Sequence, residues 1–246
     1  GPGGYSDVQK YTPYIKVTNN LYGHSIQSSV GNWNAGYAKT LSGYNSNGQN
    51  IFGTNGNEWV LWNESHDTYA GDYEKDPSRN HSEEEMLMAW CAVAARTSPA
   101  LYFSRPTTAT GTAFGSTSLG AHTNAYQDKR IAAVNKFHNA FAGETEYVTV
   151  SDNVLVVERG TSGVTLVNFS GSSKSVSIKM NKVKDGTYTE QVANQTVTVS
   201  GGTLNATIPD GGVAVIYNKG EIIKTPNITS SVVDGKTFSD TLDVTI

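Results

Sequence analysis

The spacing of apolar and polar residues divides the chain into two parts near residue 145. Before that point, short apolar runs typical of buried strands alternate with segments whose apolar residues recur at helical spacing. After it, apolar residues recur at every second position, in short runs separated by glycine-containing turns. The first pattern predicts parallel strands joined by helices, and the second predicts an antiparallel β-sandwich.

The first part contains three strand–helix units. Strands are predicted over residues 14–18, 58–63 and 99–103. Helices are predicted over residues 22–30, from residue 83 to before Pro99, and over residues 128–141. Ser82 is suited to cap the second helix and Glu85 to complete a capping box, while the acidic first turn suits the positive end of the helix.

In the second part, the predicted strands cover residues 154–158, 164–168, 175–179, 197–199 and 213–217. From residue 219 a linker-like stretch leads to Pro226 and a strand over residues 242–246. We therefore predict an α/β domain over residues 1–144, a β-sandwich over 145–218, and a linker with the start of a further module over 219–246.

Composition narrows the classes of protein. The net charge is -4 and no basic block is present, which argues against a nucleic-acid partner. No apolar run approaches the roughly 18 residues of a membrane span, so no membrane partner is expected. Charged residues make up 16% of the chain, below the ~25% of an average domain. This balance fits a secreted protein that handles sugars, in an extracellular or cell-surface setting.

Three groups of residues have more than one interpretation. Cys91 could be a nucleophile, but its apolar neighbours favour a small core residue. Residues 83–85, all glutamate, could form a metal cluster, but serving the helix start is favoured, and we assign no metal ligand. The aromatic residues Trp33, Tyr37 and Tyr44 could form a platform for a glucan, although a loop packing its own rings is favoured.

The candidate chemistry follows the predicted strand 58–63, where Glu64, His66, Asp67 and Tyr69 stand at its C-terminal edge. In parallel α/β barrels, catalytic residues collect at that edge. A carboxylate beside an imidazole and an aromatic ring suits sugar chemistry. The alternative is structural, because polar residues end many strands and Asp67 could simply cap the segment that follows.

The segment Trp62-Asn63-Glu64-Ser65-His66-Asp67-Thr68-Tyr69 resembles the region of the α-amylases of glycoside hydrolase family 13 that ends the seventh barrel strand. Further matches follow the family's order from about residue 5 to residue 218: residues 17–26 (sixth strand and its helix), 99–106 (eighth strand), 132–139 (closing helix), and 156–160 with 164–168 (sandwich). The most similar type is the secreted bacterial amylase. The resemblance implies the C-terminal part of a (β/α)8 TIM barrel, strands 6–8, followed by an antiparallel Greek-key β-sandwich.

The resemblance also implies an activity, the retaining endo-hydrolysis of α-1,4-glucosidic bonds in starch and related glucans. Such enzymes use two carboxylates about 5 Å apart and an oxocarbenium-like transition state. A third carboxylate stabilises the distorted sugar, and it matches Asp67. His66 would bind sugar hydroxyls and Tyr69 would line the cleft. Gly71 stands where the family type often has Asn, so the sequence departs from the family at that position.

The family's nucleophile and general acid belong to the fourth and fifth barrel strands, and no Arg-x-Asp pattern of the nucleophile type occurs here. Three units of eight cannot close a barrel that takes about 250 residues. We expect the chain to be inactive alone and to partner the missing N-terminal part of the barrel. No cofactor is expected in this chain, and calcium would belong to that missing part. The alternative function is a non-catalytic glucan-binding or scaffold protein derived from an amylase.

Overall fold

The computed structural model describes residues 10–39, 59–70, 81–108 and 118–218. Its first part contains three short parallel strands and the helices that follow them. In chain order these elements are β1 (Val17–Thr18), α2 (Asn20–Gly31), α3 (Gly36–Lys39), β2 (Trp59–Trp62), α4 (His66–Ala70), α5 (Glu83–Ala94), β3 (Ala100–Leu101), a 3₁₀ turn η4 (Ala125–Gln127) and α6 (Lys129–Ala140). The strands pair in the order β1-β2-β3, all parallel. This is the arrangement expected of three consecutive barrel strands.

The second part is an eight-stranded antiparallel sheet. Its strands are β4 (Glu146–Ser151), β5 (Val154–Arg159), β6 (Gly163–Val167), β7 (Lys174–Lys179), β8 (Gly186–Glu190), β9 (Gln195–Ser200), β10 (Thr203–Ile208) and β11 (Val213–Tyr217). They pair in the order β4-β5-β6-β11-β8-β9-β10-β7. Strands β8, β9 and β10 are successive neighbours and β11 returns beside β8, which is the order of a Greek key. The predicted fold class is confirmed.

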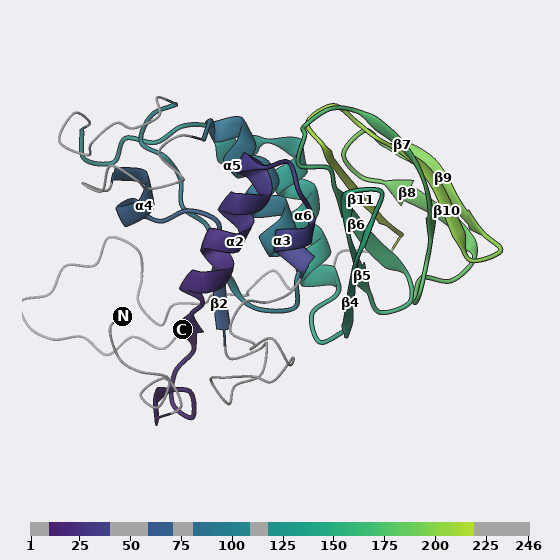
Figure 1. Ribbon diagram of the computed structural model, residues 1–246, viewed down its shortest axis with the longest axis horizontal. Coiled ribbons are helices and arrows are strands. Elements are labelled where there is room, and N and C mark those ends of the chain that lie inside the picture. The colour runs from purple at the N-terminus through teal and green to yellow at the C-terminus, as the bar shows by residue number, and fades with distance from the viewer. Residues whose placement is uncertain (1–9, 40–58, 71–80, 109–117, 219–246) are drawn as a thin grey trace, which may run out of the picture.

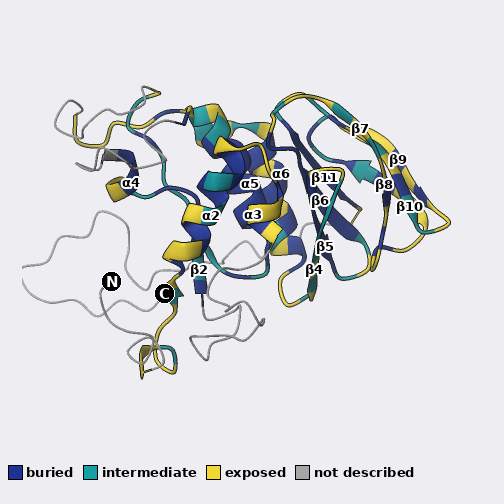
Figure 2. Ribbon diagram, in the orientation of Figure 1, coloured by how far each residue is buried: buried dark blue, intermediate teal, exposed yellow. Residues whose placement is uncertain are grey.

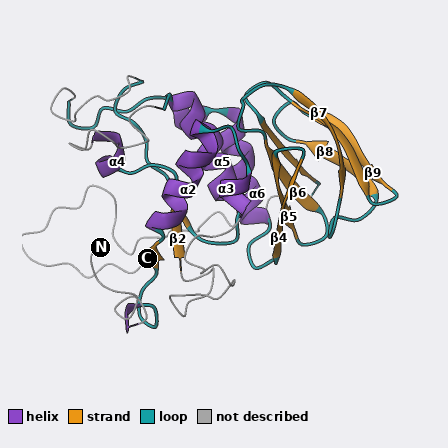
Figure 3. Cartoon of the chain, in the orientation of Figure 1, coloured by secondary structure: helices purple, strands orange, loops and turns teal. Residues whose placement is uncertain are grey.

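Helices α2, α3, α5 and α6 lie between the parallel strands and the antiparallel sheet (Figures 1 and 3). Helix α5 contacts α2 and α6, and both α5 and α6 contact strands of the sheet, β6 and β11 respectively. The two parts are therefore joined through the helices, and α4 lies at the end of the molecule away from the sheet (Figure 1).

Strands β5, β6 and β11 are buried along their whole length, whereas exposed residues alternate with intermediate or buried ones in β7 and β9 (Figure 2). One face of the three buried strands shares a core with the helices, through Leu155, Val157, Val167, Val213 and Val215. Their other face forms the sandwich interior, through Val154, Val156, Val164, Leu166, Ala214 and Ile216. Sheets covered on both faces produce continuous apolar runs of this kind.

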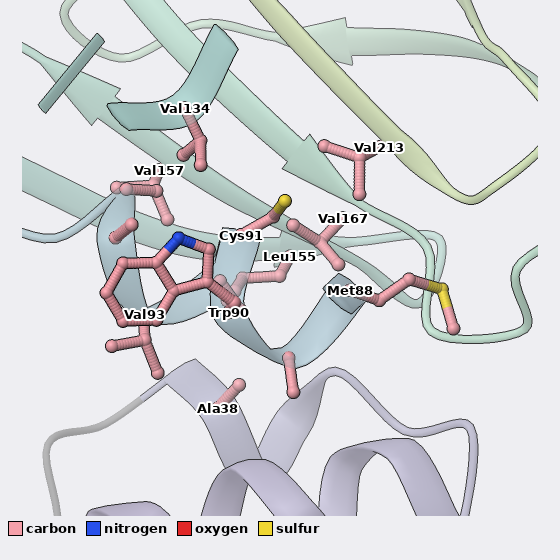
Figure 4. Packing of buried hydrophobic residues seen from close by; sticks show 14 of the residues in the cluster. Ala38, Met88, Trp90, Cys91, Val93, Val134, Leu155, Val157, Val167 and Val213 are labelled. Carbon is pink, nitrogen blue, oxygen red and sulfur yellow. The ribbon is translucent and has the colours of Figure 1, made fainter. Parts of the chain in front are cut away.

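Cys91 of helix α5 belongs to the core. The residue is fully buried, and Figure 4 shows it close to Leu155 and Val167 of the sheet. Burial raises the pKa of its thiol far above the ordinary value, so it stays a neutral thiol at physiological pH. The core interpretation of Cys91 is therefore confirmed.

The start of α5 also matches its prediction. The Ser82 hydroxyl accepts a hydrogen bond from the Glu85 amide at 3.2 Å, and a Glu85 carboxylate oxygen accepts one from the Ser82 amide at 2.7 Å. Both halves of the capping box are formed. The helix predicted over 128–141 is shorter at both ends, because Asp128 is its N-cap and Phe141 its C-cap.

Other predictions need correction. The strand predicted over 14–18 is only Val17–Thr18, because the amides of Tyr14 and Ile15 donate to the Tyr11 carbonyl and form a turn there. Strands β4, β8 and β10 were not predicted. The division predicted near residue 145 falls between α6 and β4, and it stays a prediction, as does the module at 219–246, which lies outside the described residues. Across the described ranges, no helix is long and apolar enough to cross a membrane.

Candidate active site

The predicted site residues His66, Asp67 and Tyr69 lie in the short helix α4, which follows β2. Ser65 begins this helix: its hydroxyl accepts from the Thr68 amide at 3.2 Å, and its carbonyl accepts from the Tyr69 amide at 2.9 Å. In return the Ser65 amide donates to the Thr68 hydroxyl at 2.9 Å. The cap is thus Ser65, and the interpretation of Asp67 as a capping residue is wrong.

His66 and Asp67 are neighbours on the surface. The His66 Nε2 and Asp67 Oδ1 atoms are 3.1 Å apart, and the two side chains are 72% and 83% exposed. An exposed carboxylate beside an imidazole is open to a ligand from solvent. Within the part of the barrel that this chain provides, both side chains are accessible to solvent, as a sugar-binding role requires.

Tyr69 is placed differently from its two predicted companions. Its side chain is fully buried, its ring centroid lies 5.7 Å from that of Phe103, and the Arg105 guanidinium carbon lies 5.3 Å from the ring centroid. The ring is therefore enclosed by residues that follow β3, and its contact with a sugar stays a prediction.

A buried ion pair lies next to this helix. Arg105 donates from Nε to Glu64 Oε2 at 2.8 Å and from Nη2 to Glu64 Oε1 at 2.7 Å. Both side chains are almost completely buried. Arg105 Nη2 also donates to the His81 carbonyl at 3.0 Å. The bidentate pair fixes Glu64, two residues after the end of β2, to the residues that follow β3 and to the chain entering α5.

The end of β2 is secured from two further elements. The Gln27 side chain of α2 donates to the Asn63 carbonyl at 3.0 Å, and the Asn63 side chain donates to the Met86 carbonyl of α5 at 2.8 Å. Gly23 allows α2 to approach closely, because a Cβ atom there would lie 2.4 Å from the Trp62 ring. The backbone that leads into α4 is therefore held by both neighbouring helices.

The three glutamates at the start of α5 each have a structural partner. Glu85 completes the capping box, Glu84 pairs with Arg130 at 2.5 Å, and Glu83 accepts a hydrogen bond from the Thr123 hydroxyl. Nowhere in the described ranges do three or more His, Cys, Asp or Glu side chains form a group suited to a metal ion. The structural interpretation of the glutamates is therefore supported.

The proposed aromatic platform is described only in part. Trp33 and Tyr37 are exposed, and the Asn153 side chain of the sandwich donates to the Trp33 carbonyl at 2.5 Å. Tyr44 and Gly71 lie outside the described residues. A separate open pocket of about 710 Å³ lies at the starts of α5 and α6, and His66 and Asp67 are not among the residues that line it.

Sequence reasoning picked out Glu64 but gave it no role, and it missed the contact of Arg105 with that residue. The only available signal was that Glu64 and Arg105 each follow a predicted strand, at the edge where functional residues of such folds collect.

Comparisons with known proteins agree with this architecture. No family model matches the chain. It is 30% identical, over 222 residues, to an α-amylase of Clostridium acetobutylicum, an alignment that covers 88% of this chain and 26% of that protein. The chain thus spans about a quarter of the length of this curated relative.

Solved α-amylases share the fold. Alpha-amylase from Malbranchea cinnamomea superposes with a TM-score of 0.63 at 15% identity, covering 91% of this chain and 50% of that one. Alpha-amylase I from Eisenia fetida gives a TM-score of 0.58 at 15% identity, covering 85% and 50%. The chain is therefore similar to α-amylases in sequence and shares their fold, over most of its own length and over only part of theirs.

Proposed function

We propose that the full-length protein containing this chain is an α-amylase that hydrolyses internal α-1,4-glucosidic bonds of starch-like glucans with retention. The observation that carries the proposal is the exposed pair of His66 and Asp67 at the C-terminal edge of the parallel sheet. The relation to the Clostridium α-amylase supports it. A related α-amylase I of Eisenia fetida has been solved in a complex with maltohexaose, which favours a maltooligosaccharide as ligand. The low content of charged residues, 16%, favours a site of action outside the cell.

Asp67 is proposed to stabilise the positive charge that develops on the sugar ring in the transition state. A carboxylate serves this purpose because the oxocarbenium-like state carries charge that the ground-state sugar lacks. His66, 3.1 Å away, is proposed to donate a hydrogen bond to a hydroxyl of the same sugar. The nucleophile and the general acid would come from parts of the barrel that this chain does not contain.

The test is Asp67→Asn in the full-length protein, with Asp152→Asn as the matched control. Asp152 is also an exposed aspartate, but it lies in the turn between β4 and β5 and pairs with Lys174. We expect Asp67→Asn to lower kcat on soluble starch by about 100- to 1000-fold, the cost of removing one preorganised electrostatic group. Binding of maltooligosaccharide, measured by calorimetry, should persist, and Asp152→Asn should leave both quantities unchanged.

Two results would contradict the proposal. Undiminished starch hydrolysis by Asp67→Asn would remove Asp67 from the chemistry. A full-length protein that binds maltooligosaccharides but hydrolyses none would instead identify it as a non-catalytic glucan-binding protein.

A further inference from the structure

We propose that Arg105 is a positioning residue that fixes the helix carrying Asp67, by binding that helix on both sides of His66 and Asp67. The inference rests on the function proposed above and extends it to a residue from the neighbouring strand. Arg105 itself is buried, so its role would be exerted through Glu64 and Tyr69.

The first contact is with a residue two positions before the helix. Glu64 is bound through two parallel hydrogen bonds of 2.8 and 2.7 Å, from Arg105 Nε and Nη2. This fork-to-carboxylate geometry restricts orientation as well as distance. Because both groups are buried, solvent screens the attraction little.

The second contact is with the residue two positions after Asp67. The Arg105 guanidinium carbon lies 5.3 Å from the centroid of the buried Tyr69 ring, within the range of a cation–π interaction. Phe103 packs against the same ring. One guanidinium therefore touches Glu64 and Tyr69, and the two exposed residues of the candidate site lie between these contacts in the chain.

This arrangement matters because α4 has little stability of its own. It has five residues, far fewer than the ~12 that an isolated helix needs to be marginally stable in water. Asp67 itself is exposed. Its position therefore depends on the backbone of α4, which Arg105 holds from both ends. Misplacement of a catalytic group by about 1 Å can cost on the order of 100-fold in rate.

The molecule contains a matched control for this pair. Arg96 binds Glu146 through Nε and Nη2 at 2.7 to 3.1 Å, and its side chain is buried like that of Arg105, although Glu146 is more exposed than Glu64. That pair lies where α5 ends and β4 begins, and neither residue is within the 64–70 segment. A purely structural effect of losing a buried bidentate arginine should therefore appear in both positions.

The experiment compares Arg105→Lys and Glu64→Gln with Arg96→Lys in the full-length protein. Lysine keeps the charge but loses the fork. At a temperature well below the unfolding transition of every variant, we expect both site variants to lower kcat on starch by about 10- to 100-fold. Their KM should stay within about threefold, because the lost interaction is one made in the transition state. Arg96→Lys should destabilise the protein but keep the wild-type kcat.

Hydrogen exchange of the 64–70 segment provides a readout independent of catalysis. The amides of Thr68 and Tyr69 donate to Ser65, so their protection reports whether α4 is formed. We expect faster exchange in Arg105→Lys and Glu64→Gln, and wild-type exchange in Arg96→Lys.

These readouts separate the two proposals. If Asp67→Asn is inactive while Arg105→Lys keeps the wild-type kcat, the positioning role is overturned and the proposed function stands. Unchanged exchange in the 64–70 segment of Arg105→Lys also overturns it. If Asp67→Asn keeps full activity, the proposed function fails, and exchange alone then decides whether Arg105 holds α4.

Discussion

The two ends of helix α5 each meet a buried arginine, and the two arginines are bound in different ways. At the N-terminal end, Arg105 donates to the His81 carbonyl and to the carboxylate of Glu64. At the C-terminal end, Arg159 of β5 donates to the carbonyls of Ala95, Arg96 and Phe141. The first arginine is paired with an anion beside an exposed candidate site. The second binds the carbonyls that end α5 and α6.

The different partners of Arg105 and Arg159 indicate different roles, one at the candidate site and one in the fold. Carbonyls at a helix C-terminus carry partial negative charge and lack partners within the helix. A guanidinium satisfies several of them at once. Burial lowers the pKa of Arg159, with Glu146 opposing the shift. Arg159 therefore joins the antiparallel sheet to the helices, whereas Arg105 orders the segment that presents Asp67.

The largest loss of stability should come from breaking the junction between the antiparallel sheet and the helices. Arg159→Met removes the donors to three buried carbonyls, and each hydrogen bond to a charged group contributes about 1.5–3 kcal/mol. We expect the free energy of unfolding in urea to fall by about 4 kcal/mol. The control Lys174→Met breaks a pair with the largely exposed Asp152 and should cost less than about 1 kcal/mol. Equal losses in the two variants would refute the role assigned to Arg159.

The next largest loss of stability concerns the apolar contacts of the same junction between sheet and helices. Leu155 of β5 is fully buried in the core shared with the helices, whereas Leu204 of β10 is buried in the sandwich interior. Leu155→Ala and Leu204→Ala should each cost about 3 kcal/mol. All four tryptophans of this chain precede residue 145, so their fluorescence reports on the α/β part.

If the helices and the sheet form one cooperative unit, fluorescence and far-UV circular dichroism should give a single transition in both leucine variants. Two separated transitions in Leu204→Ala would show that the sandwich unfolds alone, and the junction would then be weaker than its contacts indicate.

The contacts at the ends of α5 differ in how well they can be predicted from the sequence. The capping box at Ser82 and Glu85 is a local pattern, and it was readable because both partners lie within four residues. The pair of Glu64 with Arg105 spans 41 residues, and the contact of Arg159 with Ala95 spans 64. No local periodicity encodes such partners, because they depend on which strands become neighbours.

Strong burial makes a strand easy to predict, although the partly exposed β7 and β9 were also predicted. Strands β5, β6 and β11 are covered on both faces and have continuous apolar runs. Strand β8 opens with Gly186 and has one apolar residue, Tyr188, so its apolar alternation is weak. Strand β10 does alternate, through Leu204, Ala206 and Ile208, but the alanine at its centre is a poor strand former. Tyr69 shows the same limit for the site. Its type suggested a sugar platform, and only the fold reveals that its ring is buried.

A smaller effect is expected at the N-terminal end of α5. Ser82→Ala removes the hydroxyl that accepts from the Glu85 amide, and loss of such a cap costs about 1 kcal/mol. Ser175→Ala, on the exposed side of β7, is the control and should be neutral within about 0.5 kcal/mol. Urea unfolding measures both. A loss in Ser82→Ala as large as that in Arg159→Met would mean that the two ends of α5 do not differ as proposed.

The smallest effect is a pH dependence at that same end. Burial lowers the pKa of His81, Glu85 at 3.6 Å opposes the shift, and Arg105 adds to it. In the unfolded chain His81 titrates near pH 6.5. The unfolded state therefore binds the proton first as the pH falls. The contribution of His81 to stability is complete above about pH 6.5 and is lost as the pH drops through the lower folded-state pKa.

Stability measured by urea unfolding between about pH 7.5 and 5 tests this sign. His81→Gln should flatten the decline below about pH 6.5. Glu85→Gln should steepen it, since glutamine can keep the capping box but removes the charge that favours protonated His81. The shifts at Asp128 and Glu146 are also downward, so their effects fall at more acidic pH, below the ordinary carboxylate range. A decline that is unchanged in both variants would assign the pH dependence to groups other than His81.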